Sequence, residues 1–174
     1  TYIGGVGTQV RGRGAERKMI VAIAAEVRGK GTGRIRMAVV PDGSAESIHA
    51  FILDNVQIGS EVRTDGWRGY NGLDSRGYRH KAVNIAASGD PAHVVMPRVH
   101  RVASLFSRMW IGIHHGAIRS SHLAYYLDEY TFRFNRRKSK ARGLLFYRLM
   151  EQVVDCAPSP RKVLVGGTNT TYGM

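Results

Sequence analysis

Among the carboxylates of the chain, Asp65 has the position best suited to chemistry. It follows residues 61–64 (EVRT), which read as a short strand, and α/β architectures present ligands to a cleft at the ends of strands. A carboxylate placed there can bind a divalent metal ion, because Mg²⁺ prefers hard oxygen ligands. The alternative is a structural turn in which Asp65 hydrogen-bonds its own backbone, and for an isolated Asp-Gly pair that alternative is favoured.

Basic side chains gather in two segments. Residues 133–142 (RFNRRKSKAR) hold six of them, and residues 11–18 hold four more. Such densities suit contact with phosphate, and the presence of two clusters makes a merely solvated charge run the weaker interpretation. The residues expected to bind DNA are Arg11, Arg13, Lys18, Arg108, Arg133, Arg136, Arg137 and Lys138.

The overall charge points to the same kind of partner. The 174 residues include 26 Lys and Arg against 13 Asp and Glu, a formal net charge of +13. This excess favours a polyanion, with nucleic acid first, although a ribosomal or membrane-surface protein could carry it too. Hydrophobic residues make up 43% of the chain, which is typical of a folded protein.

Cysteine and histidine usage excludes other site types. The lone Cys156 excludes a disulfide framework within the chain and suits a reducing cytosol. No apolar run is long enough to span a membrane. The spacing of the remaining histidines matches no zinc pattern, so we expect surface or DNA-facing roles for His93, His114, His115 and His122.

The elements that must position Asp65 begin with a hairpin. Residues 19–27 (MIVAIAAEV) form a nearly continuous apolar run, which predicts a strand buried on both faces. Residues 34–40 alternate polar and apolar side chains and predict its antiparallel partner. A further strand is expected over Arg79–Ile85.

Helical periodicity appears after the hairpin and dominates the second half. Ser44 is a predicted N-cap for a helix ending before Gly59, and later helices are predicted from Val99, from Leu123 after the possible caps Ser120 and Ser121, and over Leu144–Val154. The mixture predicts an α/β domain over residues 1–156, with an irregular tail over 157–174. Three aromatic residues are expected in the core: Trp67, Tyr70 and Trp110.

Four motifs together resemble the ISXO2-like group of insertion-sequence transposases. Residues 65–73 (DGWRGYNGL) are similar to that family's second-aspartate motif. The likeness runs in family order from Thr1 to about Val154. The other motifs are residues 2–5 with 11–14 (YIGG, RGRG), 40–46 (VPDGSAE) and 122–137 (HLAYYLDEYTFRFNRR).

The resemblance implies an RNase H-like fold, with a central mixed sheet, an antiparallel hairpin and flanking helices. In such a core two aspartates and a third residue bind Mg²⁺ or Mn²⁺ for DNA cutting and joining. Asp65 matches the second aspartate. The first belongs just before the Thr-Tyr-Ile-Gly-Gly stretch, so it is expected upstream of Thr1, and the chain as given is expected to bind metal weakly.

The third position of that motif is matched by His100, which lies 35 residues after Asp65. Imidazole is a softer ligand than carboxylate and suits Mn²⁺ better than Mg²⁺, so His100 could instead orient water, or be an ordinary helix residue. Ser107 occupies a position where relatives usually carry Lys.

These observations predict a transposase catalytic domain that cleaves and joins double-stranded DNA, as a homo-oligomer in the bacterial cytoplasm at the nucleoid. Two alternatives remain open. One is an inactive, truncated remnant that only binds DNA without sequence preference. The other is a ribosomal type of RNA-binding protein, which would need charge but no acidic site.

Overall fold

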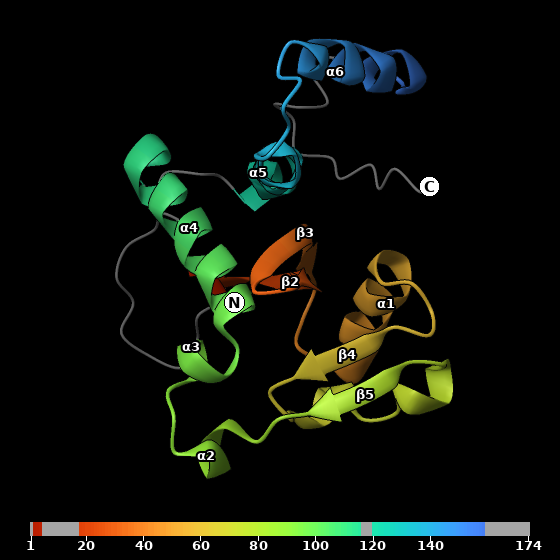
Figure 1. Ribbon diagram of the computed structural model, residues 1–174, viewed down its shortest axis with the longest axis vertical. Coiled ribbons are helices and arrows are strands. Elements are labelled where there is room, and N and C mark those ends of the chain that lie inside the picture. Colours follow the sequence, from red (N-terminus) through yellow and green to blue (C-terminus); the bar gives the residue numbers. More distant parts are fainter. Residues whose placement is uncertain (1, 5–17, 116–119, 159–174) are drawn as a thin grey trace.

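The structure is a computed structural model that describes residues 2–4, 18–115 and 120–158. All the described strands lie in the first half of the chain, together with helix α1 (Ala45–Asn55), and most of the helices lie in the second half, so the predicted mixed α/β class is confirmed (Figure 1). The predicted hairpin and its flanking helices are present. The strands, however, form two small sheets rather than one.

The first sheet is antiparallel and has the order β1-β2-β3. Strand β1 (Tyr2–Gly4) pairs with β2 (Lys18–Arg28), which pairs in turn with β3 (Gly31–Val40). Gly29 supplies the positive φ of 55° that the tight turn between β2 and β3 requires. The apolar run of β2 forms a strand because helices cover both faces of this sheet.

The second sheet consists of β4 (Glu61–Thr64) and β5 (Arg79–Ala82), which run parallel. The expectation of a single central mixed sheet is therefore not met by the described strands. Each strand here has its own partner, and no described pairing joins β1 or β3 to β4 or β5. Strand β5 ends at Ala82 instead of Ile85, because β4 offers it only four partners and Asn84 caps the next helical turn, α2 (Ile85–Ser88).

Two helices cover one face of the first sheet. They are α4 (Pro97–His114), which follows α3 (Ala92–Val95), and α5 (Leu123–Arg136). Their 3.6-residue periodicity buries one stripe of each helix against the hairpin. The buried side chains of this core are Val21, Ile35, Met37, Val102, Phe106, Trp110, Leu123, Leu127 and Tyr130.

Helix α1 (Ala45–Asn55) covers the opposite face, through Phe51 and Ile52. Ser44 caps it as predicted, since its hydroxyl accepts a hydrogen bond from the Ser47 amide at 3.2 Å. The predicted caps of α5 are wrong: residues 120–122 form a 3-10 turn, and His122 stands at the N-cap without a side-chain cap bond.

Helix α6 (Leu144–Asp155) forms where it was predicted but lies apart from both sheets in Figure 1. None of its residues is buried. Its predicted apolar ridges are exposed, including Phe146 at 63% and Val154 at 83%. No helix in the described part of the chain is long and apolar enough to cross a membrane.

Candidate metal site and nucleic-acid interface

Asp65 follows the last residue of β4 and is exposed. Its Oδ1 accepts a hydrogen bond from the Trp67 amide at 3.2 Å, which is the local Asx turn that the sequence offered as the alternative interpretation. Gly66 has φ 79°, a conformation that glycine adopts without strain. The turn uses one lone pair of one carboxylate oxygen, so it leaves the carboxylate able to accept a cation.

Polar and aromatic side chains support the end of β4. Thr64 is buried, and its Oγ1 lies 2.9 Å from Nε2 of His80 on the neighbouring strand β5. The ring of Tyr70 lies 6.3 Å from the His80 ring and 6.1 Å from that of Trp67, which meets it edge-on. Burial raises the pKa of Tyr70, and the charge of Asp65 raises it further, so Tyr70 is a neutral neighbour of this carboxylate.

The loop after Asp65 packs against α1 through His49, which is only 5% exposed. A side-chain carbon added at Gly72 would lie 3.7 Å from the His49 ring, which shows how closely the loop approaches it. Burial lowers the pKa of His49 below its ordinary 6.5; Arg76 lowers it further, a hydrogen bond with the Gly69 backbone opposes this, and His80 adds a smaller lowering effect. His49 therefore favours the neutral form.

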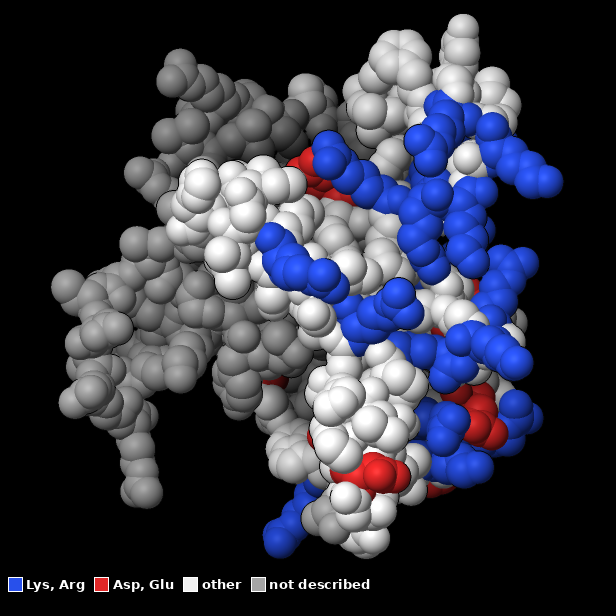
Figure 2. Space-filling model, turned by 60° about the vertical axis from the view of Figure 1, so that its left-hand side comes forward, with Lys and Arg blue, Asp and Glu red and all other residues white. Residues whose placement is uncertain are grey.

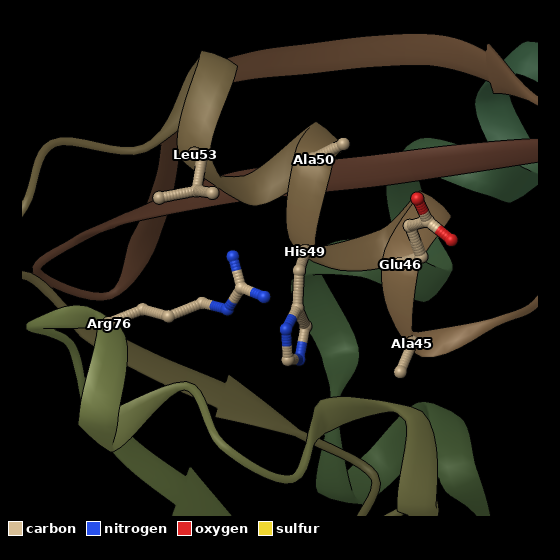
Figure 3. A pocket seen from close by; sticks show the side chains of 6 residues that line it. All are labelled: Ala45, Glu46, His49, Ala50, Leu53 and Arg76. Carbon is tan, nitrogen blue, oxygen red and sulfur yellow. The ribbon is translucent and has the colours of Figure 1, made fainter.

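A shallow cleft of about 550 Å³ lies over the same helix. Figure 3 shows the Arg76 guanidinium directed toward His49, while the Glu46 carboxylate points away from both. Neither Asp65 nor His100 lines this cleft. Its lining residues are Ala45, Glu46, His49, Ala50, Leu53 and Arg76.

His100 lies in the first turn of α4 and is exposed. No hydrogen bond or ion pair joins its side chain to Asp65, and no group of three His, Cys, Asp or Glu residues able to hold a metal occurs in the described ranges. Figure 1 shows the ends of β4 and β5 directed to the side where α3 and α4 begin. The described residues thus provide two separate candidate ligands and not an assembled metal site.

The basic residues have varied surroundings. Arg11 and Arg13 lie outside the described residues, and of Lys18 only the backbone, at the start of β2, is described. Arg108 and Lys138 are exposed. These last two side chains have the accessibility that contact with a phosphate requires.

The three arginines near the end of α5 have protein partners. Arg133 forms an exposed ion pair with Glu129 at 2.8 Å, and Arg136 lies 3.8 Å from the centre of the Phe132 ring. Arg137 has the most contacts of the three. Its guanidinium stacks 3.8 Å from the centre of the Phe134 ring and donates hydrogen bonds to three backbone carbonyls. Its first role is therefore structural, which the charge run alone did not reveal.

Of the predicted core aromatics, only Trp110 is deeply buried, at 5% exposure. The placement of Trp67 in the core is wrong: its side chain is 46% exposed and covers Gly69, where a side-chain carbon would collide with it. Tyr70 is half-buried.

Figure 2 shows Lys and Arg side chains gathered in a band along one face, with few Asp or Glu side chains among them. Fold and charge together define a mixed α/β domain with a cationic face. A family model described as the ISXO2-like transposase domain matches residues 1–135.

The chain therefore belongs to the ISXO2-like transposases, and the resemblance carried by its motifs is confirmed. This family places the chain in DNA transposition. The match ends at Asn135, so α6 lies beyond it. No curated protein and no solved structure matches the chain.

Proposed function

We propose that the chain is the catalytic core of a DDE-type transposase that hydrolyses a phosphodiester at transposon ends and joins the freed 3′-hydroxyl to target DNA. The observation that carries the proposal is an exposed aspartate directly after β4, within a chain of the ISXO2-like family. The protein would act as a homo-oligomer on double-stranded DNA at the bacterial nucleoid.

An RNase H-like fold is part of the proposal. Its support is the order of the elements, in which an antiparallel three-stranded sheet precedes α1 and a parallel pair of strands. Joining the two sheets edge to edge would produce one central mixed sheet, with α1 on one face and α4 and α5 on the other.

Asp65 and His100 are the residues we propose as ligands of Mg²⁺ or Mn²⁺. Two such ions would stabilise the attacking and leaving oxygens of an in-line displacement. The described residues alone do not form the complete ligand set. A further carboxylate is needed, and by resemblance to the family we propose an aspartate on the N-terminal side of the Tyr2-Ile3-Gly4-Gly5 motif.

The alternative is a remnant that binds DNA without cutting it. Ser107 favours this alternative. Relatives usually carry Lys at this position, so the exposed side of α4 has one positive charge fewer here. A ribosomal type of RNA-binding protein is disfavoured by membership of the transposase family.

A plasmid-nicking assay tests the proposal. It measures the nicking of supercoiled plasmid by a chain that is extended upstream of Thr1 to include an aspartate. We expect nicking that requires Mn²⁺ or Mg²⁺, and we expect Asp65→Asn to abolish it, since one ligand charge is lost with little change in volume. Asp54→Asn, an equivalent change on the exposed side of α1, is the matched control and should nick normally.

Both variants should still bind DNA, because neither removes a cation. If Asp65→Asn nicks as fast as the unchanged protein, Asp65 is no ligand and the DDE assignment fails. If the extended chain binds DNA but never nicks it under either metal, the remnant is the correct alternative.

The role of His100 is tested in the same assay. With His100→Glu we expect nicking to persist and the metal preference to shift toward Mg²⁺, because a carboxylate oxygen is the harder ligand. His93→Glu, an exposed histidine on α3, is the control and should not alter the preference. Unchanged nicking by His100→Ala with both metals would remove His100 from the site.

A further inference from the structure

The turn between β2 and β3 is held in place by arginines from two helices far away in the sequence. Arg98 of α4 donates from Nε to the Gly31 carbonyl at 3.0 Å and from NH2 to the Gly29 carbonyl at 2.8 Å. Arg137, at the end of α5, donates to the Gly33 carbonyl at 3.3 Å and to the Thr32 carbonyl. Guanidinium groups thereby donate to four carbonyls at the tip of the hairpin, one in the turn and three at the start of β3.

Asn135 extends this attachment into the strand. Its Oδ1 accepts the Ile35 amide at 2.7 Å and its Nδ2 donates to the Ile35 carbonyl at 3.0 Å, so the side chain completes the backbone pairing as another strand would. Residues 28–33, which we call the clamped tip, are therefore fixed to the start of α4 and the end of α5. A segment fixed in this way loses little conformational entropy when it binds a partner.

The same contacts bring positive charge together. Arg28 and Lys30 flank Gly29 in the clamped tip and are exposed. The two clamping arginines lie against the tip, and Lys138 follows Arg137 directly. None of these five cations takes part in an ion pair in the described part of the chain.

Glu26 places one carboxylate beside the clamped tip, next to Gly33, and its Oε2 accepts a hydrogen bond from the Arg34 amide at 2.7 Å. Its single negative charge offsets one of the five positive charges and leaves the group strongly cationic. Cations gathered this closely repel one another unless a counter-charge is present, and their combined field attracts a polyanion. Because the cations come from three elements, they suit a chain of phosphates better than a single ion. A run of nucleic-acid backbone has the required spacing of negative charge.

The clamped tip also lies at the end of α4 that carries His100. Arg98 contacts the tip, and His100 and Arg101 follow within the next turn, both exposed. We propose that Arg28 and Lys30 of the clamped tip contact DNA phosphates and hold a strand beside the start of α4. This inference rests on the proposed function and adds a binding element that the linear charge clusters did not contain.

The experiment compares two double variants of the full chain by fluorescence anisotropy on a labelled duplex, with NaCl varied from roughly 50 to 200 mM. Arg28→Gln with Lys30→Gln should weaken binding. It should also flatten the slope of log K against log salt by about 1.8, since each lost phosphate contact accounts for about 0.9.

Arg34→Gln with Arg36→Gln is the matched control. It removes the same charge from the same hairpin, but these two residues alternate with Ile35 and Met37, so they face away from α4 and α5. The control should keep the slope of the unchanged protein.

Equal flattening by both double variants would show that only net charge matters, and an unchanged slope in the tip variant would show that the tip makes no contact; either result overturns the inference. Both of these failures leave DNA binding itself intact. Absence of salt-dependent binding by the unchanged protein would instead overturn the proposed function, so the two failures are distinguishable.

Discussion

Asp65 shows how one side chain can have both a local structural role and an exposed chemical one. One carboxylate oxygen stabilises the turn after β4 by accepting the Trp67 amide, and this fixes the direction of the side chain at the end of the strand. Thr64, His80 and Tyr70 then support the strand end from within. A rotamer that is already constrained costs less to order around a cation than a free one would.

His49 provides the first prediction at this scale. Because burial disfavours its charged form, its pKa is lowered in the folded protein, while the unfolded chain keeps the ordinary 6.5. Below about pH 6.5, His49 therefore binds a proton in the unfolded state but not in the folded state. The free energy of unfolding then decreases as the pH falls from 6.5 toward the lowered pKa of the folded protein. His49→Gln should show a smaller loss of stability over this range, in urea unfolding measured from pH 7 down to about 5.5.

The control for His49→Gln is His93→Gln, because His93 is exposed. This substitution should leave the pH dependence of the stability the same as in the unchanged protein. An identical pH dependence for His49→Gln and the unchanged protein would mean that His49 is protonated in the folded state without cost. The hydrogen bond with Gly69 would then outweigh burial.

At the scale of elements, helices α4 and α5 are attached to the hairpin by polar contacts as well as by the apolar core. Asn135 is an example, since its single side-chain amide forms hydrogen bonds with both the N–H and the carbonyl of Ile35. Arg98 and Arg137 do the same for the turn. These bonds set the position of each helix along the strands, which an apolar stripe alone specifies only loosely.

Asn135→Ala should lower the free energy of unfolding by about 1–3 kcal/mol, because it leaves a part-buried donor and acceptor of Ile35 unpaired. Urea denaturation measures the change. Gln152→Ala, on the exposed α6, is the matched amide deletion and should change stability by less than about 0.5 kcal/mol. Equal effects of the two substitutions would show that the Asn135 bridge contributes nothing.

Helix α6 shows the limit of periodicity. The spacing of its apolar residues correctly predicted a helix, yet the same residues are exposed in the structure. Periodicity states which face of a helix is apolar, but a helix buries that face only where another element lies against it. Trp67 was also expected in the core, but its side chain is 46% exposed and lies over Gly69 instead.

At the scale of the whole molecule, the chain carries a net charge of +13, and Lys and Arg side chains of the described residues gather in a band on the face shown in Figure 2. We expect duplexes of unrelated sequence to bind with similar affinity, since phosphate contacts carry no base information. Affinity should fall steeply as NaCl rises over roughly 50 to 200 mM, through the loss of counterion release. Filter binding or anisotropy measures both properties, and an affinity that stays constant across this range would contradict the electrostatic interface.

Local patterns of apolar spacing, capping and motif were enough to predict the mixed class, most of the strands and helices, the Ser44 cap and the transposase family. Three features became visible only in three dimensions: the strands form two sheets, α6 lies apart, and Arg137 holds the hairpin tip rather than standing free. The fold also brought Arg28 and Lys30 to the start of α4, about 70 residues later in the chain. The physical reason is that a partner across such a distance is chosen by packing and by satisfaction of backbone groups, neither of which leaves a periodic signal in the sequence.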